Sequence, residues 1–534
     1  EEGAVHGDGF WIDHPFYNLD LLESYEGIYP DQVKELLFRR NEFVFFDNDH
    51  VVLPRQQKYR LVNGRVRQHE SVRFDLEKSN AIKSRSQKKN QVRTQFGKGE
   101  IYHTTLAAKL LCIAVNKCAT FDAAGIGLEM EADKPDWYDA LNGLPALMGS
   151  SLSETLELKR LCQYLKRNLP DGERIHLPEE LKEFIDDIGR ELAEERDPFS
   201  YWDRSGSVKE EYRRRTCYGI SGRETVVDDK QVAAFLDRVI AKCDRGIKAA
   251  LSRYGNYVTY FINEAVEFEQ TGGKVKVTRF EQKPLPLFLE GFVHALKVEG
   301  DKNIYRSVRH SPLYDKKLKM YKVNASLQAM PLEIGRARIF APGWLENESI
   351  WLHMEYKYLL ELLKAGLHDE FFGEFKNLLV PFMDPAKYRR SILENSSFIA
   401  SSAHPNKSYH GRGFVARLSG GAAEFIDIWI TMMTGKKIFR LDQAGKLVFA
   451  LAPVLPAWLF NRGELMFRLL GGIDVIYLNS KGKNTFGAGG VAPVSYVLFL
   501  NDGQKVEING PVVQTAYAEL IRRRQVKKII VSLG

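Results

Sequence analysis

The sequence predicts a mainly helical body followed by a smaller β domain. Up to about residue 437, most long segments place apolar residues at helical spacing. Beyond that point, short β-rich runs alternate with Gly and Asn/Asp-Gly turns. Of the 534 residues, 44% are hydrophobic and 27% are charged, which excludes a disordered or fibrous chain. We therefore expect a body at residues 1–437 and a β domain at 438–534.

Helices are expected at three places in the first part of the body. Within residues 1–35, aromatic residues and leucines at helical spacing predict a helix that ends near Pro30. Thr104 or Thr105 can cap a second helix, because a hydroxyl that precedes an apolar run satisfies free N–H groups. Ser153 begins a third helix with leucines on one face.

The remaining segments of the body are either irregular or rich in charge. Residues 36–100 are poorly periodic and contain a basic stretch at 81–100, which we interpret as a surface loop. Contact with phosphate or nucleic acid is the alternative, although the net charge of +7 is too small to indicate a nucleic-acid partner. Residues 178–270 combine many charges with helical periodicity, and 351–375 predict a pair of helices.

The C-terminal segment has the pattern of short strands joined by tight turns. Asn501-Asp502-Gly503 separates two extended runs and is typical of a β-hairpin. The other β-rich runs are Lys446–Ala450, Val475–Leu478, Val494–Leu500 and Lys528–Val531.

Cysteines and apolar runs indicate where the protein resides. The five cysteines form no CxxC pair, so a zinc ribbon is not expected, and their odd number favours free thiols in a reducing compartment. The longest apolar run, Leu447–Phe460, carries two prolines and is too short to cross a bilayer. We expect a cytoplasmic protein with no metal and no membrane partner.

The loop Asp136-Trp137-Tyr138-Asp139 is the first candidate for chemistry. A flat aromatic ring can stack on the C–H face of a sugar, and a neighbouring carboxyl can reach the glycosidic oxygen. The alternative is a tight interhelical turn with an Asp cap and a buried Trp.

Two further loops carry candidate binding groups. The run Arg336–Gly343 contains Phe340 and leads to Glu346 and then His353, which is either a binding residue or a core histidine. Ser419-Gly420 precedes a helical run, where exposed backbone N–H groups can hold an anion, and a plain helix cap is the alternative.

Taken in order, these motifs resemble the cellobiose-phosphorylase family of inverting glycoside phosphorylases. The closest resemblance is to the long types that act on β-1,2- or β-1,3-linked gluco-oligosaccharides. Asp136 to Asp139 match the family's DWND loop, with Tyr138 in place of Asn. Glu346 to His353 match an ENGGIFxH segment, and Ser419-Gly420 match a later [ST]G pair.

The resemblance assigns a role to each candidate residue. It makes Asp139 the general acid, and it implies that burial beside Trp137 keeps Asp139 protonated. His353, Ser419 and Gly420 would hold the phosphate, which is a substrate, and no cofactor or metal is implied. The implied sugar contacts are Trp137, Glu346, Trp11, Asp13, Phe340 and Asp136.

The resemblance also implies an architecture. The body at 1–437 would be an (α/α)6 toroid barrel with a helical insertion at about 178–270, and 438–534 would be a β-sandwich or jelly-roll-like domain. The family's N-terminal β-sandwich and first barrel helices have no counterpart here. We therefore expect an upstream segment or a companion chain to complete the barrel, and a homodimer stays open.

The implied reaction is reversible phosphorolysis of β-linked gluco-oligosaccharides to α-glucose 1-phosphate. Phosphate attacks the anomeric carbon opposite the general acid, so no second carboxylate is needed to activate water. One alternative is an inverting glycoside hydrolase, in which Glu346 or Glu394 serves as the base. Another is a non-catalytic subunit that binds carbohydrate.

Overall fold

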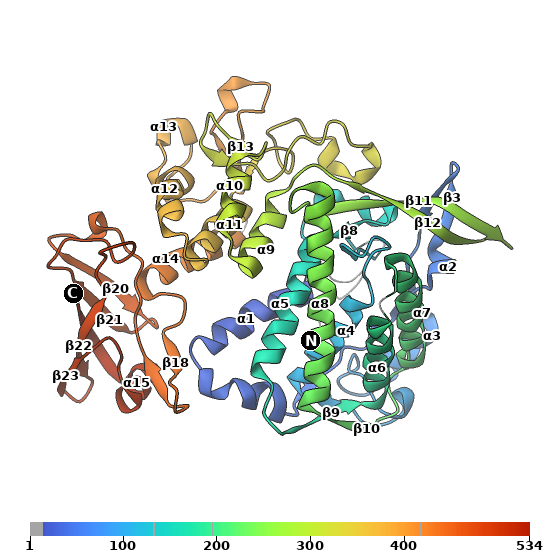
Figure 1. Cartoon of the computed structure of the whole chain (residues 1–534), viewed down its shortest axis with the longest axis horizontal. Helices are drawn as coiled ribbons and strands as arrows, with labels where there is room; N and C mark the ends of the chain where they lie inside the picture. The colour runs from blue at the N-terminus through green and yellow to red at the C-terminus, as the bar shows by residue number, and fades with distance from the viewer. Residues whose placement is uncertain (1–13, 132–133, 195, 416–418) are drawn as a thin grey trace.

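The computed structural model describes residues 14–131, 134–194, 196–415 and 419–534 (Figure 1). Helices account for 43% of the chain and strands for 22%, with the strands spread over many small sheets. A helical body forms the centre and one side of the molecule, and the C-terminal sheet lies at the opposite end (Figure 1). The candidate loops all belong to the helical body.

Five helices of the body pack in series, each against the next, in the order α1, α5, α9, α11 and α14. Leucines on their buried faces hold the series together, and Leu156, Leu158, Leu359 and Leu362 are fully buried. The bounds of these helices are α1 (His14–Glu26), α5 (Leu152–Asn168), α9 (Leu289–Glu299), α11 (Leu352–Lys364) and α14 (Ser419–Thr434).

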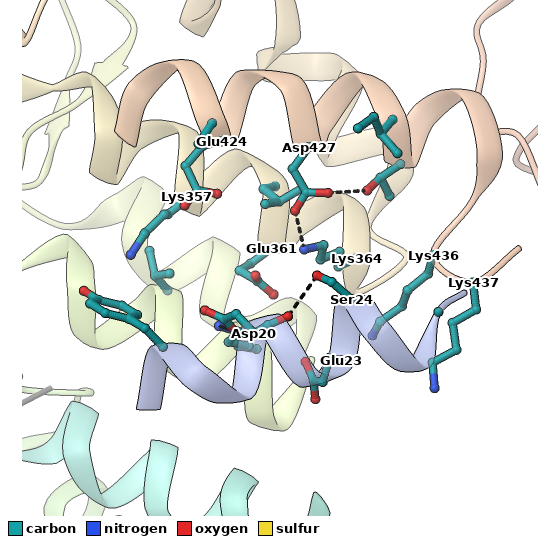
Figure 2. Close-up of a pocket in the computed structure, with 18 of the residues that line it drawn as sticks. Asp20, Glu23, Ser24, Lys357, Glu361, Lys364, Glu424, Asp427, Lys436 and Lys437 are labelled. Carbon is teal, nitrogen blue, oxygen red and sulfur yellow. Dashed lines mark hydrogen bonds and ion pairs between the residues drawn. The ribbon is translucent and has the colours of Figure 1, made fainter. Parts of the chain in front are cut away.

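The predicted (α/α)6 toroid is wrong, because strands make up 22% of the chain in many small sheets and the described helices form no closed barrel. The two ends of the helix series, α1 and α14, face each other across a cavity that is lined with charged side chains (Figure 2). Helical periodicity reports which face of a helix is buried. It carries no information on whether the first and last helices of a series meet.

Two other helices pack against this series. Helix α8 (Asp229–Tyr254) packs along α5, and α4 (Leu106–Cys118) packs against the same helix. Thr105 caps α4 by accepting a hydrogen bond from the Ala108 N–H, which confirms one of the two predicted caps. Helix α8 begins with a capping box between Asp228 and Gln231 and ends at Gly255 in the left-handed region.

The charged region predicted as a helical insertion, residues 178–270, contains α8, two further helices that fold beside α4 and α8, and the strand β10. Helices α6 (Glu179–Ala193) and α7 (Pro198–Thr216) pack against each other, and α6 also packs on α4 and α8. Strands β9 (Arg174–Pro178) and β10 (Glu224–Asp228) pair antiparallel at the base of this group.

Two hairpins lie beside the candidate loops. Strands β11 (Tyr260–Thr271) and β12 (Lys274–Pro284) form a long hairpin that projects from the body (Figure 1). Strands β3 (Tyr59–Val62) and β4 (Arg65–Gln68) form a shorter one and pack against β12. Asn63 and Gly64 both have positive φ, as a two-residue hairpin turn requires.

The C-terminal region carries one five-stranded mixed sheet and the short two-stranded sheet β18-β19, so the predicted β-sandwich is wrong. The strand order is β20-β21-β24-β22-β23, and β21 and β24 run parallel. Helix α15 (Thr515–Arg522) crosses between β23 and β24, and such a crossover lets two strands of one sheet run parallel. The predicted hairpin at Asn501-Asp502-Gly503 is confirmed, because it joins β22 to β23. The strands are β20 (Glu464–Leu469), β21 (Ile473–Leu478), β22 (Pro493–Leu500), β23 (Lys505–Asn509) and β24 (Val526–Leu533).

The end of α1 is joined to the C-terminal region by backbone and ionic contacts. The Phe439 N–H donates to the Gly27 carbonyl, and Lys437 pairs with Glu26. Arg522 of α15 pairs with Asp31, just beyond α1. The first described helix is therefore fastened to the C-terminal region.

Shorter elements complete the description. No helix in the described ranges is both long and apolar enough to cross a membrane. The remaining helices are α2 (Arg55–Lys58), α3 (Leu76–Lys83), α10 (Lys302–His310), α12 (His368–Leu378) and α13 (Pro385–Tyr388). The remaining strands are β1 (Phe43–Val44), β2 (His50–Val52), β5 (Val72–Phe74), β6 (His103–Thr104), β7 (Leu128–Glu129), β8 (Ser150–Ser151), β13 (Tyr314–Asp315), β14 (Met320–Tyr321), β15 (Ile350–Trp351), β16 (Phe398–Ile399), β17 (Gly413–Phe414), β18 (Phe439–Leu441) and β19 (Leu447–Phe449).

Candidate functional site

Buried polar groups fix the loop that carries Trp137 and Asp139. The Asp136 carboxylate is buried and accepts a hydrogen bond from the Trp137 N–H at 2.9 Å. The buried Tyr138 hydroxyl accepts a hydrogen bond from the Asn324 side-chain amide at 2.9 Å. The Trp-Tyr pair is thus divided, with Tyr138 in the core and Trp137 only partly covered.

Asp139 forms an ion pair at the surface of the site. Its carboxylate lies 3.1 Å from the guanidinium of Arg336, and the two side chains are 42% and 47% exposed. The expected burial of Asp139 beside Trp137 is therefore not found. The carboxylate is instead exposed and engaged by a guanidinium.

Two loops interlock to bring Arg336 to Asp139. The Arg336 N–H donates to the Asn142 side chain at 3.0 Å, and the Gly143 N–H donates to the Ile334 carbonyl. Gly335 has a φ of +126°, and a Cβ there would lie 2.7 Å from the Ala140 carbonyl oxygen. Only glycine permits this approach, so Gly335 is required for the ion pair to form.

Glu346 belongs to the same cluster. Burial raises the pKa of its carboxyl, Arg336 opposes that rise and the charge of Asp139 adds to it. Buried Asn324 fixes the segment, because its amide donates to the Glu346 carbonyl and its oxygen accepts from the Glu348 N–H. The site thus holds two carboxyl groups in different environments, one ion-paired and one partly buried.

His353 lies on the other side of Trp137. The two rings meet edge to face with their centroids 5.8 Å apart. The Nε2 atom of His353 lies 3.6 Å from Oε1 of Glu424 on α14. Burial lowers the pKa of His353, although Glu424 opposes this effect. His353 is therefore partly buried and has a polar partner in Glu424.

The start of α14 lies directly against His353. A Cβ at Gly420 would come within 2.8 Å of two atoms of the imidazole ring. A small sheet makes this possible, because β15 leads into α11 and pairs through β16 with β17, which precedes α14. Gly420 lies in the first turn of α14, and the start of a helix is a place where backbone N–H groups can bind an anion.

The remaining predicted site residues make other contacts or lie outside the described side chains. Phe340 packs against the hydrophobic core, and its carbonyl accepts a hydrogen bond from Asn347. Glu394, the alternative base, pairs with Arg390. Ser419 begins α14, but its side chain, like Trp11 and Asp13, lies outside the described part of the structure.

The sequence predictions omitted Arg336 and Asn324. Arg336 stands in a run that was singled out, and the Gly335 before it signals a special backbone conformation. No local pattern marks Asn324, because its role depends on contacts with two distant loops.

A cavity of about 1080 Å³ adjoins this cluster and shares Asp136 and Glu424 with it. Figure 2 shows Glu424 and Asp427 on α14 above Asp20 and Glu23 on α1. Two ion pairs lie in the wall of the cavity. Lys364 pairs with Asp427 at 2.8 Å, and Lys297 pairs with Asp20 at 2.7 Å. No group of three or more His, Cys, Asp or Glu residues in the described ranges is placed to hold a metal ion.

Comparison of the sequence with models of protein families gives no match, and comparison with curated proteins gives none either.

Proposed function

We propose that this chain carries the active site of an inverting phosphorylase for β-linked gluco-oligosaccharides, similar to the cellobiose-phosphorylase family. One observation supports this most strongly. Three motifs that are far apart in the sequence meet around Trp137, which precedes Asp139 by two residues and contacts His353, which in turn abuts Gly420. A core role for each motif separately does not require this meeting.

In the proposed reaction, a glucose unit stacks on Trp137 and presents its glycosidic oxygen to Asp139. Asp139 gives its proton to the leaving oxygen as the bond to the anomeric carbon breaks. Phosphate attacks that carbon from the opposite face and forms α-glucose 1-phosphate. His353, Ser419 and the N–H groups of the first turn of α14 hold the phosphate.

The ion pair with Arg336 sets a condition on this mechanism. The Arg336 guanidinium lies 3.1 Å from the Asp139 carboxylate, so substrate must displace Arg336 before its glycosidic oxygen can reach Asp139. A bound oligosaccharide does this in two ways. Its hydroxyl groups compete for the guanidinium, and its apolar faces exclude water from around the ion pair.

The test is whether turnover requires phosphate. Wild-type protein is incubated with β-1,2-, β-1,3- and β-1,4-linked glucans in the presence and absence of phosphate, and the products are followed by ³¹P NMR. We expect α-glucose 1-phosphate from at least one glucan. His353→Ala and Ser419→Ala should raise the KM for phosphate and leave the KM for sugar nearly unchanged. Sugar products without phosphate incorporation would refute the proposal.

An inverting hydrolase is the second candidate, and the proximity of Asp139 to Glu346 favours it. The charge of Asp139 raises the pKa of Glu346, so the two carboxyl groups lie within electrostatic reach. An inverting hydrolase usually has two carboxyl groups that flank the sugar, one as the general acid and one as the general base. In that case Glu346→Gln abolishes turnover, and phosphate has no effect on the rate.

A further inference from the structure

A residue of strand β4 hydrogen-bonds to both ends of the loop that carries Asp139. Gln68 is buried, and its side-chain amide donates to the Pro145 carbonyl at 3.0 Å and to the Met130 carbonyl at 3.5 Å. These two carbonyls bracket the loop, which runs from residue 131 to residue 144. One side chain thus sets the distance between the two ends of the loop.

Arg67, the neighbouring residue on β4, binds the loop that carries Arg336. The Arg67 guanidinium is buried and donates to Glu333 at 3.3 Å from both Nε and Nη2. Glu333 stands three residues before Arg336, in the segment that interlocks with the Asp139 loop. Arg67 also reaches Glu264 on β11, so the contact is tied to the long hairpin.

A third contact fixes the beginning of the Asp139 loop. Glu131 is surrounded by Lys58, which immediately precedes β3, and by Lys209 and Arg213 of α7. These cations hold the pKa of Glu131 well below its usual range, although burial opposes this effect. The loop is therefore anchored in the same hairpin region that supplies Gln68 and Arg67.

We propose that Gln68 and Arg67 are positioning residues that set the geometry of the Asp139–Arg336 pair from strand β4. Neither residue touches the pair itself in this arrangement. Gln68 fixes the loop of Asp139, Arg67 fixes the loop of Arg336, and their adjacency in one strand keeps the two loops in register. The consequence for catalysis rests on the proposed function, whereas the consequence for loop order does not.

Three variants test this inference. Gln68→Met removes the two donated hydrogen bonds at nearly constant volume. Arg67→Lys keeps the charge but removes the planar guanidinium that donates two hydrogen bonds to Glu333. Val62→Ala is the matched control, because Val62 is 45% exposed at the tip of the same hairpin. Circular dichroism and thermal melting establish that each variant is folded.

The first readout is hydrogen exchange at residues 131–144 and 332–340. We expect faster exchange in both segments for Gln68→Met, faster exchange mainly at 332–340 for Arg67→Lys, and no change for Val62→Ala. The second readout is turnover. Misplacement of a reacting group by about 1 Å can cost about 100-fold, so kcat should fall roughly 10- to 100-fold while the KM for sugar stays nearly constant.

Leaving-group dependence separates a misplaced acid from a general loss of structure. An aryl β-glucoside with a good leaving group needs little protonation, so its turnover should fall less than that of an oligosaccharide. Unchanged exchange in both segments, or loosened loops with an unchanged kcat, would overturn the inference. If the wild type turns over no glucan at all, the proposed function fails, and the exchange data still decide whether β4 positions the two loops.

Discussion

Gly420 lies so close to His353 that a side chain at position 420 would overlap the imidazole ring. The ideal Cβ position is 2.8 Å from both Cε1 and Nδ1 of the histidine. At the next position, Gly421, an ideal Cβ would have the His353 backbone nitrogen as its nearest neighbour, at 4.0 Å. Two adjacent glycines of one helix therefore differ completely in the space around them.

Gly420→Ala should displace the His353 ring or the first turn of α14. We expect the KM for phosphate to rise at least tenfold, because the histidine and the helix N-terminus no longer face one site. Gly421→Ala is the control and should leave the KM unchanged. It should raise the free energy of unfolding by about 0.5–1 kcal/mol, because Ala is a better helix former than Gly. Equal kinetics for the two variants would contradict the proposed phosphate site.

Asp139→Asn should reduce turnover of oligosaccharides by roughly 10²- to 10⁴-fold, because general acid catalysis is lost. The fold should survive, because the pair with Arg336 is solvent-exposed and such pairs contribute less than about 1 kcal/mol. Initial rates and a thermal melt measure the two effects. Glu394→Gln should remain active, and a comparable loss in that variant would instead support the hydrolase with Glu394 as its base.

Glu424→Gln should lower the pKa of His353 further. Burial already lowers this pKa, and the Glu424 carboxylate is the group that opposes the effect. Histidine-selective ¹³C NMR titration gives the value directly. Asp427→Asn, one turn farther along α14, removes a carboxylate that pairs with Lys364 and should leave the His353 titration unchanged. An unchanged or raised pKa in Glu424→Gln would show that the two side chains do not interact.

A buried cluster next to the Asp139 loop should make stability depend on pH in two opposite ways. Burial raises the pKa of Glu129 from 4.5 to about 7, so this group favours folding in acid and loses that contribution as pH rises from 4.5 through 7. Burial and neighbouring cations lower the pKa of Lys209 to about 7, so its cost to folding is relieved as pH rises from about 7 toward 10.

Thermal melts from about pH 5 to about pH 10 measure both effects. Glu129→Gln should flatten the decline on the acid side, and Lys209→Met should flatten the rise on the alkaline side. Each variant is compared with the wild type at every pH, because other groups contribute to the absolute curve. A wild-type-like slope in either variant would exclude that residue as the source.

Local features of the fold could be predicted where local chemistry decides them. Thr105 caps α4, and Asn501-Asp502-Gly503 turns a hairpin, because each depends on residues within a few positions. The strand order of the C-terminal sheet could not be predicted. The parallel pairing of β21 with β24 depends on α15, which connects strands that are not neighbours.

The candidate site was predicted in part. Asp139, His353 and Gly420 could be singled out because they stand in short motifs, and the structure links them through Trp137. Gln68 could not, because it acts on a loop that is remote in sequence, and no local pattern pairs Arg336 with Asp139 although Arg336 stands in a candidate run. The expected burial of Asp139 failed because a neighbouring Trp does not determine how much water reaches a carboxylate.

The attachment of α1 to the C-terminal region has a consequence for synthesis of the chain. Glu26 and Lys437 are 411 residues apart, and ribosomes add about 5–20 residues per second, so α1 waits roughly 20–80 seconds for this partner. During that interval the acidic face of α1 has no cation from the C-terminal region to meet. Maturation therefore includes a late step, in which a newly made segment docks onto a helix that left the ribosome long before it.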